Sequence, residues 1–155
     1  MRLALLALFA ACTPKPDAPP AETAPDDALH ADVVEVTWAG AEGAWVFTVS
    51  LLSPDVDCTR YADWWELVDP SGALVYRRIL NHSHADEQPF ARSGDPLAVA
   101  SDQELVVRGH LHPQGYGGAA FRGSLATGFA LDPTVTAAFA PDLEGQAPLP
   151  EECWW

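Results

Sequence analysis

The stretch from Trp64 to Leu80 constrains the fold most strongly, because it predicts a β-hairpin. Its centre, Asp69-Pro70-Ser71-Gly72, has Asp first, Pro second and Gly fourth, an order that favours a type I turn. Runs of aromatic and branched residues flank this turn at 64–68 and 74–80. Two such runs around a short turn indicate paired antiparallel strands, and their bulk predicts that the hairpin belongs to the core.

Adjacent strand residues point to opposite faces of a sheet, so at least one of Trp64 and Trp65 is expected in the core. The other is expected on the second face, under the loop that carries His82 and His84. Arg77 and Arg78 also point to opposite faces, and one of them is expected to pair with an acid such as Glu66 across the hairpin.

Further short strands are expected on both sides of the hairpin. Alternation of apolar and polar residues predicts two before it, at 32–38 and 44–52. The first should direct Val34, Val36 and Trp38 to one side, and the second Trp45, Phe47, Val49 and Leu51. After a polar loop at 81–96, strands are expected at 97–100, 104–111 and 121–131, while 134–140 fits either a short helix or a last strand.

About seven short strands without a long helix favour an all-β fold, an antiparallel β-sandwich. The immunoglobulin-like sandwich is one form of this architecture, although Cys58 and Cys153 do not match its disulfide spacing. The aromatic residues Trp38, Trp45, Trp64, Trp65 and Tyr76 could form a platform for a glycan, but residues of this kind are more typical of the core of a small domain.

The N-terminus predicts export. Met1-Arg2 gives a positive start, and an apolar run from Leu3 to Ala11 is too short to span a bilayer but suits a signal peptide. The run ends in Ala10-Ala11-Cys12, which resembles the lipobox of bacterial lipoproteins. That resemblance implies cleavage after residue 11 and lipidation of Cys12. It also implies an outer-membrane location, because Thr13 stands where Asp commonly signals retention at the inner membrane.

The segment 12–31 is rich in Pro, Ala and Asp and has no apolar periodicity, which predicts a disordered tether after the lipidated cysteine. The β-sandwich domain is then expected over 32–155. In the oxidising cell envelope, the two remaining cysteines, Cys58 and Cys153, are expected to form a disulfide, since neither belongs to a Cys-x-x-Cys motif.

The charge of the chain excludes some partners. Lys and Arg number 8 against 22 Asp and Glu, giving a formal net charge of −14. Nucleic acids need clustered cationic side chains, so no nucleic-acid partner is expected. Direct electrostatic attachment to anionic lipid is disfavoured for the same reason, and contact with the membrane is expected through the N-terminal lipid alone.

The histidines suggest a second interpretation. His82/His84 and His110/His112 form two His-x-His pairs, and residues two apart on an extended backbone project to the same side. The two pairs could bind zinc or copper, with Glu87 or Asp86 as an oxygen ligand. Solvated histidines in a loop and at a strand end would give the same pattern.

No motif of a known enzyme class is present: the chain lacks Gly-x-Ser-x-Gly and Ser-x-x-Lys, and its Gly-rich stretch at 114–118 is no phosphate loop. The segments DWWELVD, LVYRRIL and HSHADEQPF resemble predicted lipoproteins of environmental bacteria, a resemblance that implies no particular activity. The sequence therefore predicts a non-enzymatic, lipid-anchored envelope lipoprotein without a cofactor, which binds an envelope protein or a glycan. The alternative is a zinc- or copper-binding β-domain.

Overall fold

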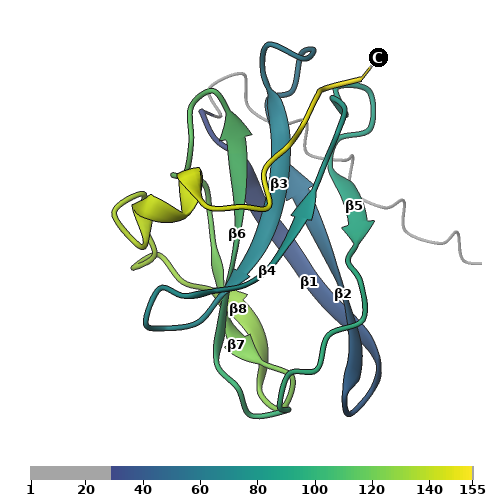
Figure 1. The fold of residues 1–155 in the computed structure, drawn as a ribbon, viewed down its shortest axis with the longest axis vertical. Helices are drawn as coiled ribbons and strands as arrows, with labels where there is room; N and C mark the ends of the chain where they lie inside the picture. The colour runs from purple at the N-terminus through teal and green to yellow at the C-terminus, as the bar shows by residue number, and fades with distance from the viewer. Residues whose placement is uncertain (1–28, 155) are drawn as a thin grey trace, which may run out of the picture.

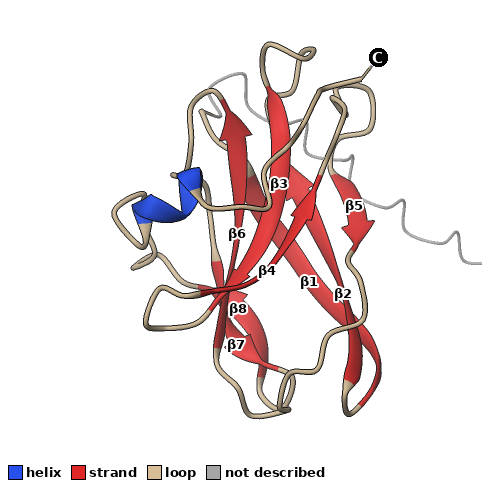
Figure 2. Ribbon diagram, in the orientation of Figure 1, coloured by secondary structure: helices blue, strands red, loops and turns tan. Residues whose placement is uncertain are grey.

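The computed structural model describes residues 29–154 and contains eight strands in two antiparallel sheets (Figures 1 and 2). The first sheet has the order β1-β2-β5 and the second β4-β3-β6-β7-β8. The strands are β1 (Asp32–Ala41), β2 (Ala44–Leu52), β3 (Tyr61–Val68), β4 (Leu74–Ile79), β5 (Phe90–Ser93), β6 (Leu105–His112), β7 (Phe121–Ser124) and β8 (Gly128–Leu131). A 3-10 helix, η1 (Pro141–Gly145), follows. The expected antiparallel β-sandwich is confirmed.

The predicted hairpin is present and central. β3 pairs with β4 on one side and with β6 on the other, and all eight of its residues are buried. At the turn, Gly72 N–H donates to the Asp69 carbonyl at 2.9 Å, and the Asp69 carboxylate accepts from the backbone of Ser71 and Ala73. Gly72 has φ +93°, a conformation that favours glycine. The turn therefore has the residues that its backbone requires.

The core lies between the two sheets. Trp65 is fully buried there and packs against Tyr76, with ring centroids 5.5 Å apart. β2 directs Phe47, Val49 and Leu51 into the same core, as its alternation predicts. Trp38 and Trp45 pack against the core from its margin. Four of the five candidate aromatic residues therefore pack in or against this core, so the five do not form an exposed glycan platform.

Several expectations about individual segments were wrong. A register shift between Val33 and Glu35 breaks the alternation of β1, so Val33 is buried and Val34 is exposed. The strand expected at 97–100 is only a single bridge between Leu97 and Trp45. The predicted polar loop instead contains the short strand β5, which pairs with β2. The segment 121–131 is a hairpin, β7 and β8, and 134–140 is turn without a regular element.

The second sheet is covered on both faces. Its outer face, which points away from the first sheet, carries a second apolar cluster made by Val68, Val106, Ala120, Val135 and Leu143. The C-terminal segment 132–154, here called the strap, crosses this face in front of β6 and β3 (Figure 1). In the part of the chain described, no helix is both long and apolar enough to cross a membrane.

Candidate functional site

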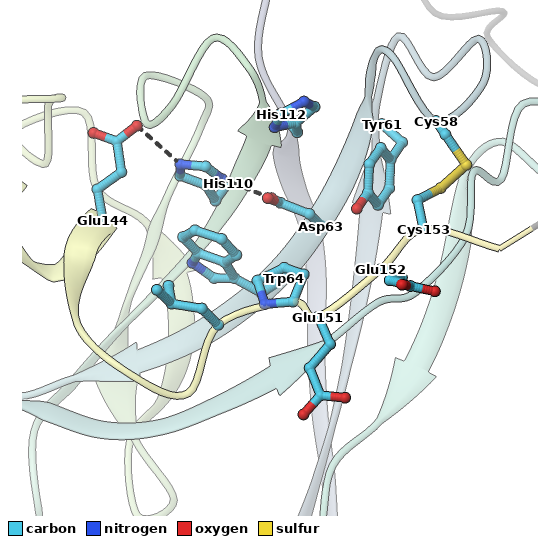
Figure 3. A pocket seen from close by; sticks show the side chains of 12 residues that line it. Cys58, Tyr61, Asp63, Trp64, His110, His112, Glu144, Glu151, Glu152 and Cys153 are labelled. Atoms are coloured by element: carbon cyan, nitrogen blue, oxygen red, sulfur yellow. Dashed lines mark hydrogen bonds and ion pairs between the residues drawn. A yellow bond between two sulfur atoms is a disulfide. The ribbon is translucent and has the colours of Figure 1, made fainter.

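A pocket of about 460 Å³ lies between the outer face and the strap (Figure 3). Its floor comes from β3 and β6 and its wall from η1 and the end of the strap. We call it the outer-face pocket, and its lining residues are Cys58, Tyr61, Asp63, Trp64, His110, His112, Glu144, Leu149, Pro150, Glu151, Glu152 and Cys153. Pockets of 300–1,000 Å³ are typical of small-molecule sites.

A β-bulge in β3 shapes the floor of this pocket. Ala62 pairs with Leu111 and Trp64 with His110, so Asp63 is the extra residue of the longer strand. Bulges of this kind redirect a side chain beside a site. Ala62 and Trp65 belong to the core between the sheets, whereas Asp63 and Trp64 both line the outer-face pocket. The bulge thus turns the Asp63 carboxylate to the outer face, whereas strict alternation from Trp65 would direct it toward the core.

His110 lies between two carboxylates. Its Nδ1 is 2.6 Å from Asp63 Oδ1, and its Nε2 is 3.3 Å from Glu144 Oε1 (Figure 3). The imidazole is also stacked on Trp64, with ring centroids 3.7 Å apart and an interplanar angle of 9°. Asp63 and His110 are each only 4% exposed, while the Glu144 side chain is 56% exposed. His110 is therefore held in one orientation by the protein interior.

Two groups of the pocket keep free hydrogen-bonding capacity. Asp63 Oδ1 is hydrogen-bonded to His110 Nδ1, and no described side chain donates a hydrogen bond to Asp63 Oδ2. Tyr61 is 5% exposed, its hydroxyl makes no hydrogen bond within the described residues, and Figure 3 shows it pointing into the pocket. Burial raises the pKa of Asp63, an effect opposed by the hydrogen bond from His110. Burial and the neighbouring carboxylates raise the pKa of Tyr61.

A buried charge network fixes the strap above the floor. Glu66 accepts from Arg77 Nε and Arg108 Nε, each at 2.8 Å, so the expected pairing of Arg77 with Glu66 is confirmed. Other N–H groups of these two guanidiniums donate to the strap carbonyls of Leu143, Gln146, Pro148, Phe139 and Ala140. Arg77 also lies 4.3 Å from the Trp64 ring centroid. These three residues, Glu66, Arg77 and Arg108, are here called the triad, and they stabilise the face that carries the pocket.

The predicted disulfide is present. Cys58 and Cys153 are bridged with their Cα atoms 5.6 Å apart, and they are separated by 95 residues in the sequence. The bridge lines the outer-face pocket and attaches the end of the strap to the loop before β3 (Figure 3). Trp154 N–H also donates to the Asn81 carbonyl at 2.6 Å. The end of the strap is thus fastened on both sides of the pocket wall.

The structure does not bring the two histidine pairs together. His110 and His112 line the outer-face pocket, whereas His82 and His84 line two other pockets beside the loop 81–87. Glu87, the expected oxygen ligand, pairs instead with Arg92 at 2.6 Å. Within residues 29–154 no three His, Cys, Asp or Glu side chains are placed to hold one metal ion. The zinc or copper site therefore has no geometric support.

The His82/His84 pair has a different environment from the pair in the outer-face pocket. His84 is 2% exposed and stacks on Phe90, with ring centroids 3.9 Å apart, while His82 is exposed beside it. Neither ring nitrogen of His84 has a hydrogen-bond partner, and its Nδ1 lies 3.8 Å from Asp55 Oδ2, too far for a hydrogen bond. Burial, with the nearby charges of Arg92 and His82, lowers the pKa of His84 to about 4.

Sequence reasoning placed Trp64 wrongly and missed most of the pocket. Trp64 does face away from the core, but it lies under the strap beside His110, and not under the loop that carries His82. Asp63 and Glu144 were missed. An acid directly before two Trp residues of a predicted strand was the available signal for Asp63. No feature of the sequence indicated that Glu144, which is distant in the chain, would lie beside His110. The predicted signal peptide, lipidated Cys12 and tether lie outside the described residues, apart from residues 29–31.

A comparison with curated proteins finds a protein of Halomicrobium mukohataei named "Putative lipoprotein", 40% identical over 100 residues. The match covers 64% of this chain and 49% of that protein, so the chain spans about half the length of this relative. Only 31 residues precede β1, so most of the match must fall within the β-sandwich. No family model matches the chain. No solved structure matches it either. The comparisons thus add a related protein but no described site.

Proposed function

We propose that this chain is a lipid-anchored lipoprotein of the cell envelope that acts as a non-enzymatic binding module. The observation that carries the binding role is the outer-face pocket, where the buried Asp63 and Tyr61 keep unused hydrogen-bonding capacity. A protein interior normally satisfies such groups, so their exposure to a pocket favours a ligand that completes them.

The anchoring rests on different support. The N-terminal sequence ends an apolar run at Cys12, and the related protein is named as a lipoprotein. The disulfide between Cys58 and Cys153 fits an oxidising compartment. We further infer the outer membrane as the destination, from Thr13 after the lipidated cysteine.

The absence of enzymatic activity remains part of the proposal. The described lining residues of the pocket include no Ser or Thr, and its two cysteines are joined to each other. His110 therefore has no Ser or Thr hydroxyl and no free thiol within this lining to activate as a nucleophile. A binding role uses the same groups without that requirement.

The form of the sandwich fits an adhesive or binding scaffold. We infer an immunoglobulin-like arrangement, because β1-β2-β5 facing β4-β3-β6-β7 has the order A-B-E facing C′-C-F-G. Such folds carry many unrelated functions, so this likeness concerns architecture and supports no particular ligand.

Replacement of Cys12 tests the anchor. In a bacterial host fed labelled palmitate, the wild-type protein should incorporate label and Cys12→Ser should incorporate none, because the thiol is the site of acylation. Cys58→Ser serves as the matched control and should keep its label, since this cysteine lies in the folded domain. Continued labelling of Cys12→Ser would show that the anchor is elsewhere.

A further inference from the structure

We propose that the outer-face pocket binds a small organic cation through an ammonium or guanidinium group, which donates N–H hydrogen bonds to Asp63 Oδ2 and the Tyr61 hydroxyl oxygen. This ligand class rests on the binding role proposed above and specifies it. The proposal follows from the free acceptors, the charge and the size of the pocket.

The free acceptors lie on buried, immobile residues. Asp63 is held by its hydrogen bond to His110, and His110 is held by stacking on Trp64. Tyr61 lies two residues before Asp63, the extra residue of the bulge, and Figure 3 shows its hydroxyl directed into the pocket. Neither position depends on a ligand. A donor that enters the pocket therefore meets a preorganised carboxylate oxygen and a preorganised phenol oxygen.

The charge of the lining selects a cation. Four acidic residues line the pocket, Asp63, Glu144, Glu151 and Glu152, and its described lining has neither Lys nor Arg. Two guanidiniums of the same face, Arg77 and Arg108, are held by Glu66 and by strap carbonyls. Burial of Asp63 makes its ionised form costly, and a cation beside it would offset that cost. An anionic ligand would instead be repelled by these carboxylates.

Size and ligand geometry favour an organic cation over a metal ion. The pocket holds about 460 Å³, the range of small-molecule sites, whereas a metal ion needs several ligand atoms at about 2 Å. The described residues offer no such cluster of three or more side chains. Leu149 and Pro150 add apolar wall, which suits the methylene groups of an alkyl amine.

The test uses the full-length protein purified in a non-ionic detergent and titrated calorimetrically with putrescine. The matched ligand is 1,4-butanediol, which has the same carbon chain but hydroxyls in place of ammonium groups. Putrescine should bind saturably at one site and butanediol should not bind. N-acetyl-lysine amide, titrated in parallel, distinguishes a free amine from a basic side chain as the source of the cation. Binding of either amine supports the proposal, and failure of both to bind overturns it.

Variants separate the pocket from the general acidity of the chain. Tyr61→Phe removes one oxygen, and Asp63→Asn removes one charge while keeping an oxygen for His110. Hydrogen bonds to charged groups contribute enough that each variant should weaken putrescine binding about tenfold or more. Glu87→Gln, an acid outside the pocket, is the control and should bind as the wild type does. Circular dichroism identifies variants that remain folded.

Three further results would overturn the proposal: equal binding of butanediol, wild-type affinity in folded Tyr61→Phe, or an equal loss of affinity in Glu87→Gln. Each would mean that putrescine binding depends on the overall negative charge of the protein or on apolar contacts, and not on Asp63 and Tyr61. These results are independent of the Cys12→Ser labelling. A failure of anchoring leaves the titration interpretable, and a failure of amine binding leaves the anchor in place.

Discussion

Removal of the Glu66 charge should be the most destabilising single change of an ionisable group in the sandwich. Glu66 is fully buried, and its two carboxylate oxygens lie 2.6–2.8 Å from guanidinium nitrogens of Arg77 and Arg108. Glu66→Gln keeps the shape of the side chain but leaves two buried guanidiniums facing each other without a counter-charge. Breaking a buried ion pair by removing one partner costs about 3–5 kcal/mol.

The position of the triad supports the upper part of that range. The two guanidiniums also hold the strap through carbonyls of residues 139–148, so a shift of either one disturbs the cover of the outer face. A small domain has a total stability of about 5–15 kcal/mol, so the variant should remain folded in water but unfold at much lower urea concentration.

The assay is equilibrium unfolding in urea, followed by tryptophan fluorescence and extrapolated linearly to water. Glu87→Gln is the matched control, because Glu87 also pairs with an Arg at 2.6 Å but its side chain is 56% exposed. Surface pairs of this kind contribute about 0–1 kcal/mol. If Glu66→Gln loses no more than Glu87→Gln at an unchanged m-value, the view of the triad as a stabilising buried network is wrong.

Two further predictions concern burial. Trp65→Ala should lower the free energy of unfolding by about 3–5 kcal/mol, because this fully buried indole fills the space between the sheets; urea unfolding measures the loss. Trp64→Ala should also disturb the stacked His110 and weaken putrescine binding, which calorimetry measures. His84 has a pKa of about 4 in the fold against an ordinary 6.5, so the unfolded chain binds more protons between these values and stability should fall as pH decreases from 6.5 to 4. The loss should approach about 3 kcal/mol, and His84→Phe, which cannot be protonated, should remove this part of the pH dependence; an unchanged profile would contradict the assignment.

The sequence alone determined the elements whose signals are local. Alternation fixed the inward face of β2, and the turn residues 69–72 fixed the β3–β4 hairpin, because backbone preference and side-chain period act over a few neighbouring residues. The pairing of Cys58 with Cys153 followed from their being the two cysteines left in a domain that the N-terminal sequence predicts to be exported, which needs no knowledge of the fold. The local signals failed where long-range pairing overrode them, as for β5 and the bulge at Val34.

The tertiary structure decided the candidate site. Asp63 reaches the outer face through a bulge that depends on the pairing of β3 with β6, and Glu144 reaches His110 only because the strap folds back across the sheet. His82 and His110 carry the same motif in the sequence, yet one pair lies on a loop and the other on a strand under the strap. Contacts between residues far apart in the chain form because they bury apolar surface and pair charges together, and no short stretch of sequence encodes that sum.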